Sequence, residues 1–206
     1  MHHASLPAAA NWALIMLCVG GAVVAAVGLL GSRPAAGRLD RYGGRSSELF
    51  HLIMLAAMTV MASEWSGSLS ATRWRQLFGA LAIASAVWLI AETRGRSSDR
   101  GDRIGAAGYH CVAALAMVYA TLGSAAASTG HAHHAATGHP VDSPYPVLGW
   151  FLAGVFLLDA VVAAAAVVRP PGGVESTTRR RVVTVFPHLT MDIAMTMMLV
   201  AGLTSF

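Results

Sequence analysis

Six stretches dominated by apolar residues follow one another along the chain and are separated by short polar segments. A helix needs about 20 mostly apolar residues to cross the hydrocarbon core of a bilayer. The pattern therefore predicts an all-α fold, a polytopic membrane bundle of six transmembrane helices that forms a single domain over residues 1–206. The predicted spans lie near residues 12–31, 48–66, 74–93, 104–127, 147–168 and 182–204.

Charged residues are scarce and unevenly placed. They make up 12% of the 206 residues, and all 14 basic residues are arginines. A soluble domain carries about 25% charged residues, so the composition supports the membrane prediction and makes the lipid bilayer the main partner. Because the arginines gather in short segments between spans, where they set topology, the net charge of +4 needs no nucleic-acid partner. These arginine-rich segments are 32–47, 94–103 and 169–181.

The remaining connections predict the orientation of the chain. The first eleven residues and the segment 128–146 contain no arginine. The connection between the second and third predicted spans is an exception, because Arg73 and Arg75 lie in or next to it. Arginine-rich connections face the cytoplasm by the positive-inside rule. We therefore expect a multi-pass protein of the inner (plasma) membrane with both termini outside the cytoplasm. The first span is interpreted as a retained helix, because no basic residue precedes it as in a signal peptide.

In the second, fourth and sixth predicted spans, a histidine is followed seven residues later by a methionine, and an alanine directly precedes each methionine. Seven residues are about two helical turns, so each histidine and its methionine share a helix face, about 10 Å apart along the axis. Each copy follows an arginine-rich segment, which predicts three parallel two-helix repeats with their histidines at similar depth. The pairs are His51 and Met58, His110 and Met117, and His188 and Met195.

The three pairs predict a metal site inside the membrane. Imidazole and thioether together suit copper, and ionisable side chains within spans usually face the protein interior and mark a function. We expect a layer of three histidines, with the three methionines nearer to mid-membrane. Asp192 follows His188 by four residues on the same helix face and is a further candidate ligand. Asp159 lies at comparable depth and is interpreted either as a partner of the site or as a hydrogen-bonding group across the hairpin.

The predicted outer segment 128–146 is rich in histidine. Short tracts of this kind commonly bind metal ions, which predicts a capture site outside the membrane. The alternative is a solvated loop whose histidines bind nothing. The candidate ligands in this segment are His131, His133, His134 and His139.

The sixth span contains the phrase Phe186-Pro-His-Leu-Thr-Met-Asp-Ile-Ala-Met195. With this phrase, six short spans and histidine-led even spans, the chain resembles an uncharacterised family of actinobacterial polytopic membrane proteins, known as a domain of unknown function. The resemblance extends from about residue 10 to residue 206. It implies no activity, and no functional residue is taken from it.

Three functional hypotheses follow from these features. The leading one is an integral membrane protein that binds or conducts a transition-metal ion, with copper as the preferred ion, in transport, storage or delivery. The second is a redox protein of b-cytochrome type, in which two of the three intramembrane histidines hold haem b. The third is a non-catalytic accessory subunit of a larger membrane complex, in which the histidines form structural hydrogen bonds. The sequence contains no phosphate-binding loop, zinc-protease motif or serine elbow, so we expect that the chain is not an enzyme.

Overall fold

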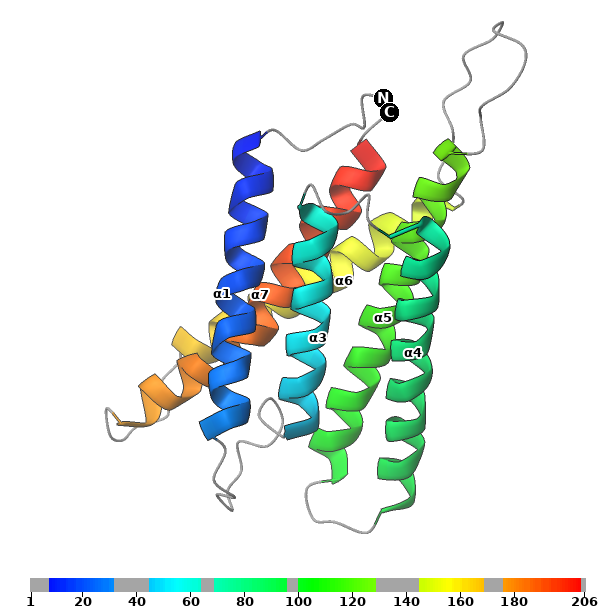
Figure 1. Cartoon of the computed structure of the whole chain (residues 1–206). Coiled ribbons are helices and arrows are strands. Elements are labelled where there is room, and N and C mark those ends of the chain that lie inside the picture. Colours follow the sequence, from blue (N-terminus) through cyan, green and yellow to red (C-terminus); the bar gives the residue numbers. More distant parts are fainter. Residues whose placement is uncertain are drawn as a thin grey trace, which may run out of the picture.

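The computed structural model describes residues 8–31, 45–63, 69–95, 100–128, 145–168 and 176–204, and these residues form six α-helices (Figure 1). The all-α prediction is therefore confirmed. The predicted outer ligands His131, His133, His134 and His139 lie outside the described residues. The helices are α1 (Ala8–Gly31), α3 (Arg45–Ala62), α4 (Ala71–Arg94), α5 (Arg100–Ser128), α6 (Pro146–Val168) and α7 (Ser176–Thr204).

Five of these helices are long and apolar enough to cross a membrane, namely α1, α4, α5, α6 and α7. The chain is thus a multi-pass membrane protein. Helix α3 differs from the predicted span 48–66, because it covers Arg45–Ala62 and is only 18 residues long. Its first turn contains Arg45, two serines and Glu48, and these polar residues lower the hydropathy of an already short helix. Five of the six predicted spans are thus long apolar helices, and the second is a shorter, more polar helix.

The helices pack first as sequential pairs. The closest packing joins α1 to α3, α4 to α5 and α6 to α7, which confirms the predicted arrangement in three hairpins. Helices α3, α5 and α7 also contact one another, and α1 contacts α7. In Figure 1, α6 (yellow) and α7 (orange to red) run obliquely behind α1 and α3. The three helices that carry the His-Met pairs therefore meet within the bundle.

Small residues allow these close helix contacts. A side chain at Gly21 of α1 would collide with the Thr190 side chain of α7, and its Cβ would lie 3.0 Å from Leu55 Cδ1 of α3. Small residues at crossings let helix backbones approach within a membrane, where packing drives association. Gly21 thus allows α1 to pack closely against the two helices that bear His51 and His188.

The interior and the exterior of the bundle differ in the side chains they carry. Met58, Met117 and Met195 are buried in one apolar core cluster together with Met54 and Met191. The outward side chains of α1 recur every three or four residues, which is the spacing of one helix face. This face carries Trp12, Met16, Val19, Val23 and Val27, all of them exposed and suited to contact lipid.

The helix ends next to the arginine-rich segments lie on one side of the bundle. Figure 1 shows that α1, α4 and α6 end on the side where α3, α5 and α7 begin. His51, His110 and His188 therefore lie nearer to this side, six to twelve residues after the helix starts at Arg45, Arg100 and Ser176. The assignment of this side to the cytoplasm stays a prediction.

Candidate metal centre

The three intramembrane histidines lie together in the bundle interior. His51 of α3 and His110 of α5 are each 1% exposed, and His188 of α7 is 5% exposed. The ring centroids of His51 and His110 are 4.7 Å apart, and those of His51 and His188 are 5.6 Å apart. The structure thus brings together three residues that the sequence separates by up to 137 positions.

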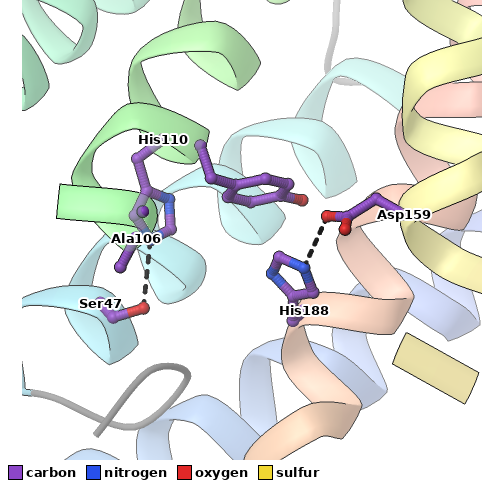
Figure 2. A pocket seen from close by; sticks show the side chains of 7 residues that line it. Ser47, Ala106, His110, Asp159 and His188 are labelled. Atoms are coloured by element: carbon purple, nitrogen blue, oxygen red, sulfur yellow. Dashed lines mark hydrogen bonds and ion pairs between the residues drawn. The ribbon is translucent and has the colours of Figure 1, made fainter. Parts of the chain in front are cut away.

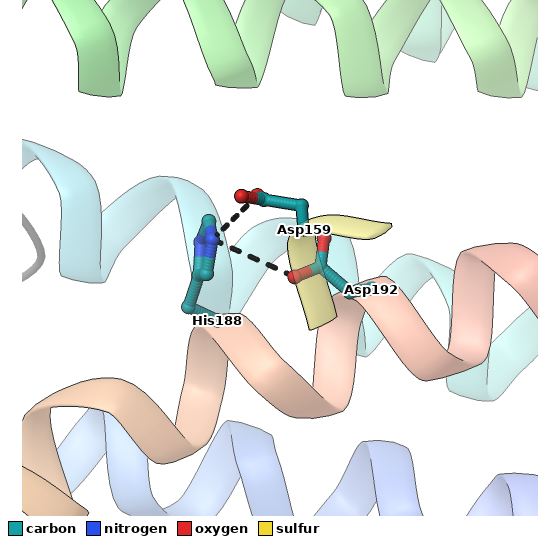
Figure 3. A group of neighbouring side chains, drawn as sticks. All are labelled: Asp159, His188 and Asp192. Atoms are coloured by element: carbon teal, nitrogen blue, oxygen red, sulfur yellow. Dashed lines mark hydrogen bonds and ion pairs between the residues drawn. The ribbon is translucent and has the colours of Figure 1, made fainter. Parts of the chain in front are cut away.

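Two carboxylates accompany only one of these histidines, His188 (Figure 3). Its Nε2 lies 2.9 Å from Asp159 Oδ2 on α6 and 3.5 Å from Asp192 Oδ2 on α7. One ligand atom from each of the three side chains lies within 4.8 Å of the other two. Helix geometry explains two of the three members, because Asp192 follows His188 by four residues on the same face of α7. The packing of α6 on α7 adds the third member, Asp159, which lies next to His188.

Asp192 is the most deeply buried member of the group, with 0% exposure. Its Oδ1 accepts a hydrogen bond of 2.5 Å from the Tyr109 hydroxyl of α5. Its Oδ2 lies within ion-pair distance of His188 but has no hydrogen-bond partner among the described residues. The Tyr109 ring also packs 4.2 Å, centroid to centroid, from the His188 ring. Tyr109 therefore orients both a carboxylate and an imidazole of the group.

A chain of hydrogen-bonding contacts leads from His188 to the other two histidines. His188 Nδ1 lies 3.4 Å from His51 Nε2, and His51 Nδ1 lies 3.5 Å from Ser47 Oγ. The same hydroxyl oxygen lies 3.2 Å from His110 Nε2 (Figure 2). Because one of the two nitrogens in the His188–His51 contact must donate, the tautomer of His188 sets that of His51, and the Ser47 hydroxyl connects His51 to His110.

His110 has an aromatic environment in place of an acidic one. Its ring stacks on Phe50 at a centroid distance of 5.2 Å and on Trp88 at 6.0 Å. Phe50 and Trp88 stack on each other at 5.5 Å. The Nδ1 atom of His110 is buried and has no hydrogen-bond partner among the described residues. The imidazole is thus held by ring packing and by Ser47.

The predicted ligands divide into two groups in the structure. His51, His110, His188 and Asp192 lie in one connected network. Met58, Met117 and Met195 lie in the apolar core, two helical turns from their histidines along each helix. The mutually close ligand atoms come from Asp159, His188 and Asp192, so His51 and His110 approach the group through His188.

The structure also adds residues that the sequence pattern did not select. Asp159 is a direct partner of His188, whereas the sequence left its role open between two interpretations. Ser47 and Tyr109 were not candidates. A signal for Ser47 exists, because it precedes His51 by four residues and so shares its helix face. Tyr109 adjoins His110, but only packing shows that its hydroxyl reaches Asp192 on another helix.

Residues 43–202 match a protein family described as a domain of unknown function (DUF5134). The chain belongs to this family. The match includes α3 to α6 and all but the end of α7, and thus every residue of the network. The predicted resemblance to a domain of unknown function is confirmed over these residues, while the actinobacterial origin stays a prediction. Comparisons with curated proteins and with solved structures gave no match.

Proposed function

We propose that this membrane protein binds a divalent transition-metal ion between Asp159, His188 and Asp192. The observation that carries the proposal is the mutual proximity of three ligand atoms, all within 4.8 Å, on two helices of the bundle interior. Two ligands about 2.1 Å from a tetrahedral ion lie about 3.4 Å from each other. The separations of His188 Nε2 from Asp159 Oδ2 and Asp192 Oδ2, 2.9 and 3.5 Å, are close to this value.

The charge of the group supports a cation. Carboxylates within a membrane protein are costly unless they are neutralised or paired. No arginine of the described residues lies within ion-pair distance of Asp159 or Asp192. The buried Asp192 Oδ2 has no hydrogen-bond partner in the same part of the chain, although it is fully shielded from solvent. A divalent ion would balance two carboxylates and use this oxygen.

The donor set favours an ion of the zinc, iron or manganese group. It consists of one imidazole nitrogen and two carboxylate oxygens, which suit these ions, whereas the prediction of copper depended on thioether sulfur. Met58, Met117 and Met195 pack in the apolar core and supply no atom to the group of close ligands. Copper binding through these methionines would therefore need a second site, separate from Asp159, His188 and Asp192. A transport role that relies on the methionines would need that second site as well.

Neighbouring residues would hold the ligands in place. Tyr109 donates to Asp192, and His51 contacts the second nitrogen of His188. Partners of this kind fix the tautomer and ring orientation of a metal-bound histidine and contribute to affinity. His51 and Asp192, both predicted from the sequence as ligands, thus have distinct roles in this proposal. Asp192 is a ligand, whereas His51 positions the ligand His188.

The two alternative hypotheses fit the geometry less well. A haem held by two histidines needs the porphyrin between their nitrogens, but His51 Nε2 and His188 Nδ1 are 3.4 Å apart and in direct contact. For an accessory subunit, the histidines would form only structural hydrogen bonds. The buried Asp192 Oδ2, which has no hydrogen-bond partner among the described residues, would then have no role.

The experiment measures bound metal in the purified full chain in detergent. After incubation with Zn²⁺ and removal of free ions, we expect about one zinc ion per wild-type chain. Asp192→Asn keeps the side-chain shape and an oxygen for Tyr109 but removes the charge, so zinc should fall below about a tenth of this value. Asp102→Asn, the same substitution near the start of α5, is the matched control and should bind zinc like the wild type.

A wild-type chain without zinc, iron or manganese would overturn the proposal and favour the accessory subunit. Equal zinc content in Asp192→Asn and wild type would place any bound ion elsewhere. The combined substitution of Met58, Met117 and Met195 by leucine separates the proposal from the copper prediction. We expect this variant to retain zinc binding, because leucine preserves the apolar packing.

A further inference from the structure

A cavity of about 290 Å³ adjoins the proposed metal site. Asp159 and His188 lie on one side of it, and Ser47 and His110 lie on the other (Figure 2), while Tyr109 also lines it. Asp192 is not among the lining residues, so the cavity meets the group from the side of Asp159 and His188. The Asp159 side chain is 38% exposed, whereas the Asp192 side chain is fully buried, so the group is accessible at Asp159.

Three protein ligands leave a metal ion with an open position. Metal sites with a structural role usually have four protein ligands, whereas sites that bind an exchangeable molecule usually have three. Here two of the three ligands line the cavity and the third lies behind them. We infer that the ion holds a small, neutral oxygen-donor molecule, of the carbonyl or amide class, in this cavity. The inference rests on the proposed function and gives its site an exchangeable ligand.

The charge of the site selects a neutral molecule. A divalent ion with two carboxylates and a neutral imidazole has no net charge. An additional anion would then remain uncompensated within the membrane, which is unfavourable. The cavity volume of about 290 Å³ lies at the lower limit of ligand pockets, which range from about 300 to 1,000 Å³. A molecule of a few non-hydrogen atoms fits these limits.

The opposite wall is linked to the proposed ion through the contacts of His188, His51 and Ser47. When His188 Nε2 binds the ion, its proton must reside on Nδ1, which then donates to His51 Nε2. His51 in turn donates through Nδ1 to Ser47, and Ser47 donates to His110 Nε2. When Ser47 donates in this way, His110 carries its proton on Nδ1, the buried atom that lacks a partner among the described residues. This nitrogen is buried and does not reach the cavity, so a molecule that binds the ion through a single oxygen fits this wall.

Two small residues of α5, Gly105 and Ala106, complete the lining of the cavity. A Cβ atom built at Gly105 meets no other atom within 4 Å, so a larger side chain can be placed there without a clash near the backbone. Leucine at this helical position would extend into the cavity region and should also favour the helix relative to glycine. Gly105→Leu therefore blocks the cavity and leaves Asp159, His188 and Asp192 in place.

The experiment uses Co²⁺, which replaces zinc and reports its ligands by visible absorption, and the neutral amide acetamide as the probe. In the cobalt-loaded full chain, the probe should produce a saturable change of the cobalt spectrum. Gly105→Leu should bind as much cobalt as the wild type but need at least about tenfold more probe for the same change. Gly101→Leu is the matched control, since it lies one turn earlier on α5, also has open space at Cβ, and does not line the cavity.

The outcomes separate the inference from the proposed function. A cobalt-loaded wild-type chain whose spectrum does not respond to the probe would overturn the inference and leave the metal site intact. A chain that binds no cobalt would overturn the proposed function as well. An equal probe response in Gly105→Leu and Gly101→Leu would place the ligand outside the cavity. If both Gly105→Leu and Ala106→Leu lost cobalt, the cavity would not be separate from the metal ligands, which also contradicts the inference.

Discussion

His188 and His110 occupy the same position in two copies of the repeated His-Met pattern, but His188 has an acidic environment and His110 an aromatic one. His188 lies between two carboxylates, at 2.9 and 3.5 Å from its Nε2, and against the Tyr109 ring. His110 stacks on Phe50 and Trp88 and contacts only the Ser47 hydroxyl among hydrogen-bonding groups described for its ring. The comparison shows that a repeated histidine does not imply a repeated role. The residues contributed by neighbouring helices decide which histidine can hold an ion.

The largest expected difference separates these two histidines directly. His188→Ala removes a ligand atom and should weaken zinc binding by more than about 100-fold, whereas His110→Ala should change it by less than about tenfold. The physical reason is that His110 reaches the group only through Ser47 and His51. Zinc affinity of the purified variants measures both effects. An equal loss in the two variants would restore the prediction that the histidines bind one ion together.

A smaller effect is expected for the residue that orients the acidic side. Tyr109→Phe removes the hydroxyl that donates to Asp192 Oδ1 at 2.5 Å but keeps the ring against His188. Loss of a hydrogen bond to a metal ligand typically lowers affinity by about 10- to 100-fold. Zinc titration measures the change, and the thermal midpoint in detergent controls for folding. Unaltered affinity would show that Asp192 needs no support from α5.

The smallest effect concerns the aromatic side and should not involve metal at all. Phe50→Leu removes the rings' stacking with Trp88 and His110, which is worth about 0.5–1.5 kcal/mol per aromatic pair. We expect a lower thermal midpoint, by a few degrees for a loss of about 1 kcal/mol, with unchanged zinc content. A loss of zinc at an unchanged midpoint would show that the aromatic side also shapes the metal site.

Much of the architecture follows from the sequence because the membrane restricts the choices. Backbone groups in hydrocarbon must be satisfied within helices, so an apolar run of sufficient length can be interpreted as a span. Five spans and the pairing into hairpins were predictable on this basis. Helix α3 departs from the pattern because its first turn, with Ser47 and Glu48, contains polar groups that are buried among other helices. Hydropathy alone does not distinguish such burial from exposure.

The candidate site was only partly predictable. The periodicity of a helix placed Asp192 beside His188, and the shared entry side of the spans placed three histidines at one level. The same reasoning gave the methionines equal weight, although Met58, Met117 and Met195 pack in the apolar core. Spacing along one helix specifies a face but not the helix that this face meets. The role of Asp159 was therefore left open between two interpretations, and Tyr109 was not a candidate.

The sequence by itself determined that helices cross a membrane in pairs and which faces carry imidazole and carboxylate, because apolar length and helical period are local properties. The tertiary structure decided which of these groups meet. Asp159 reaches His188 because α6 packs on α7, and Tyr109 reaches Asp192 because α5 contacts α7. Contacts of this kind depend on the rotation and crossing of whole helices, which the packing of many side chains sets together.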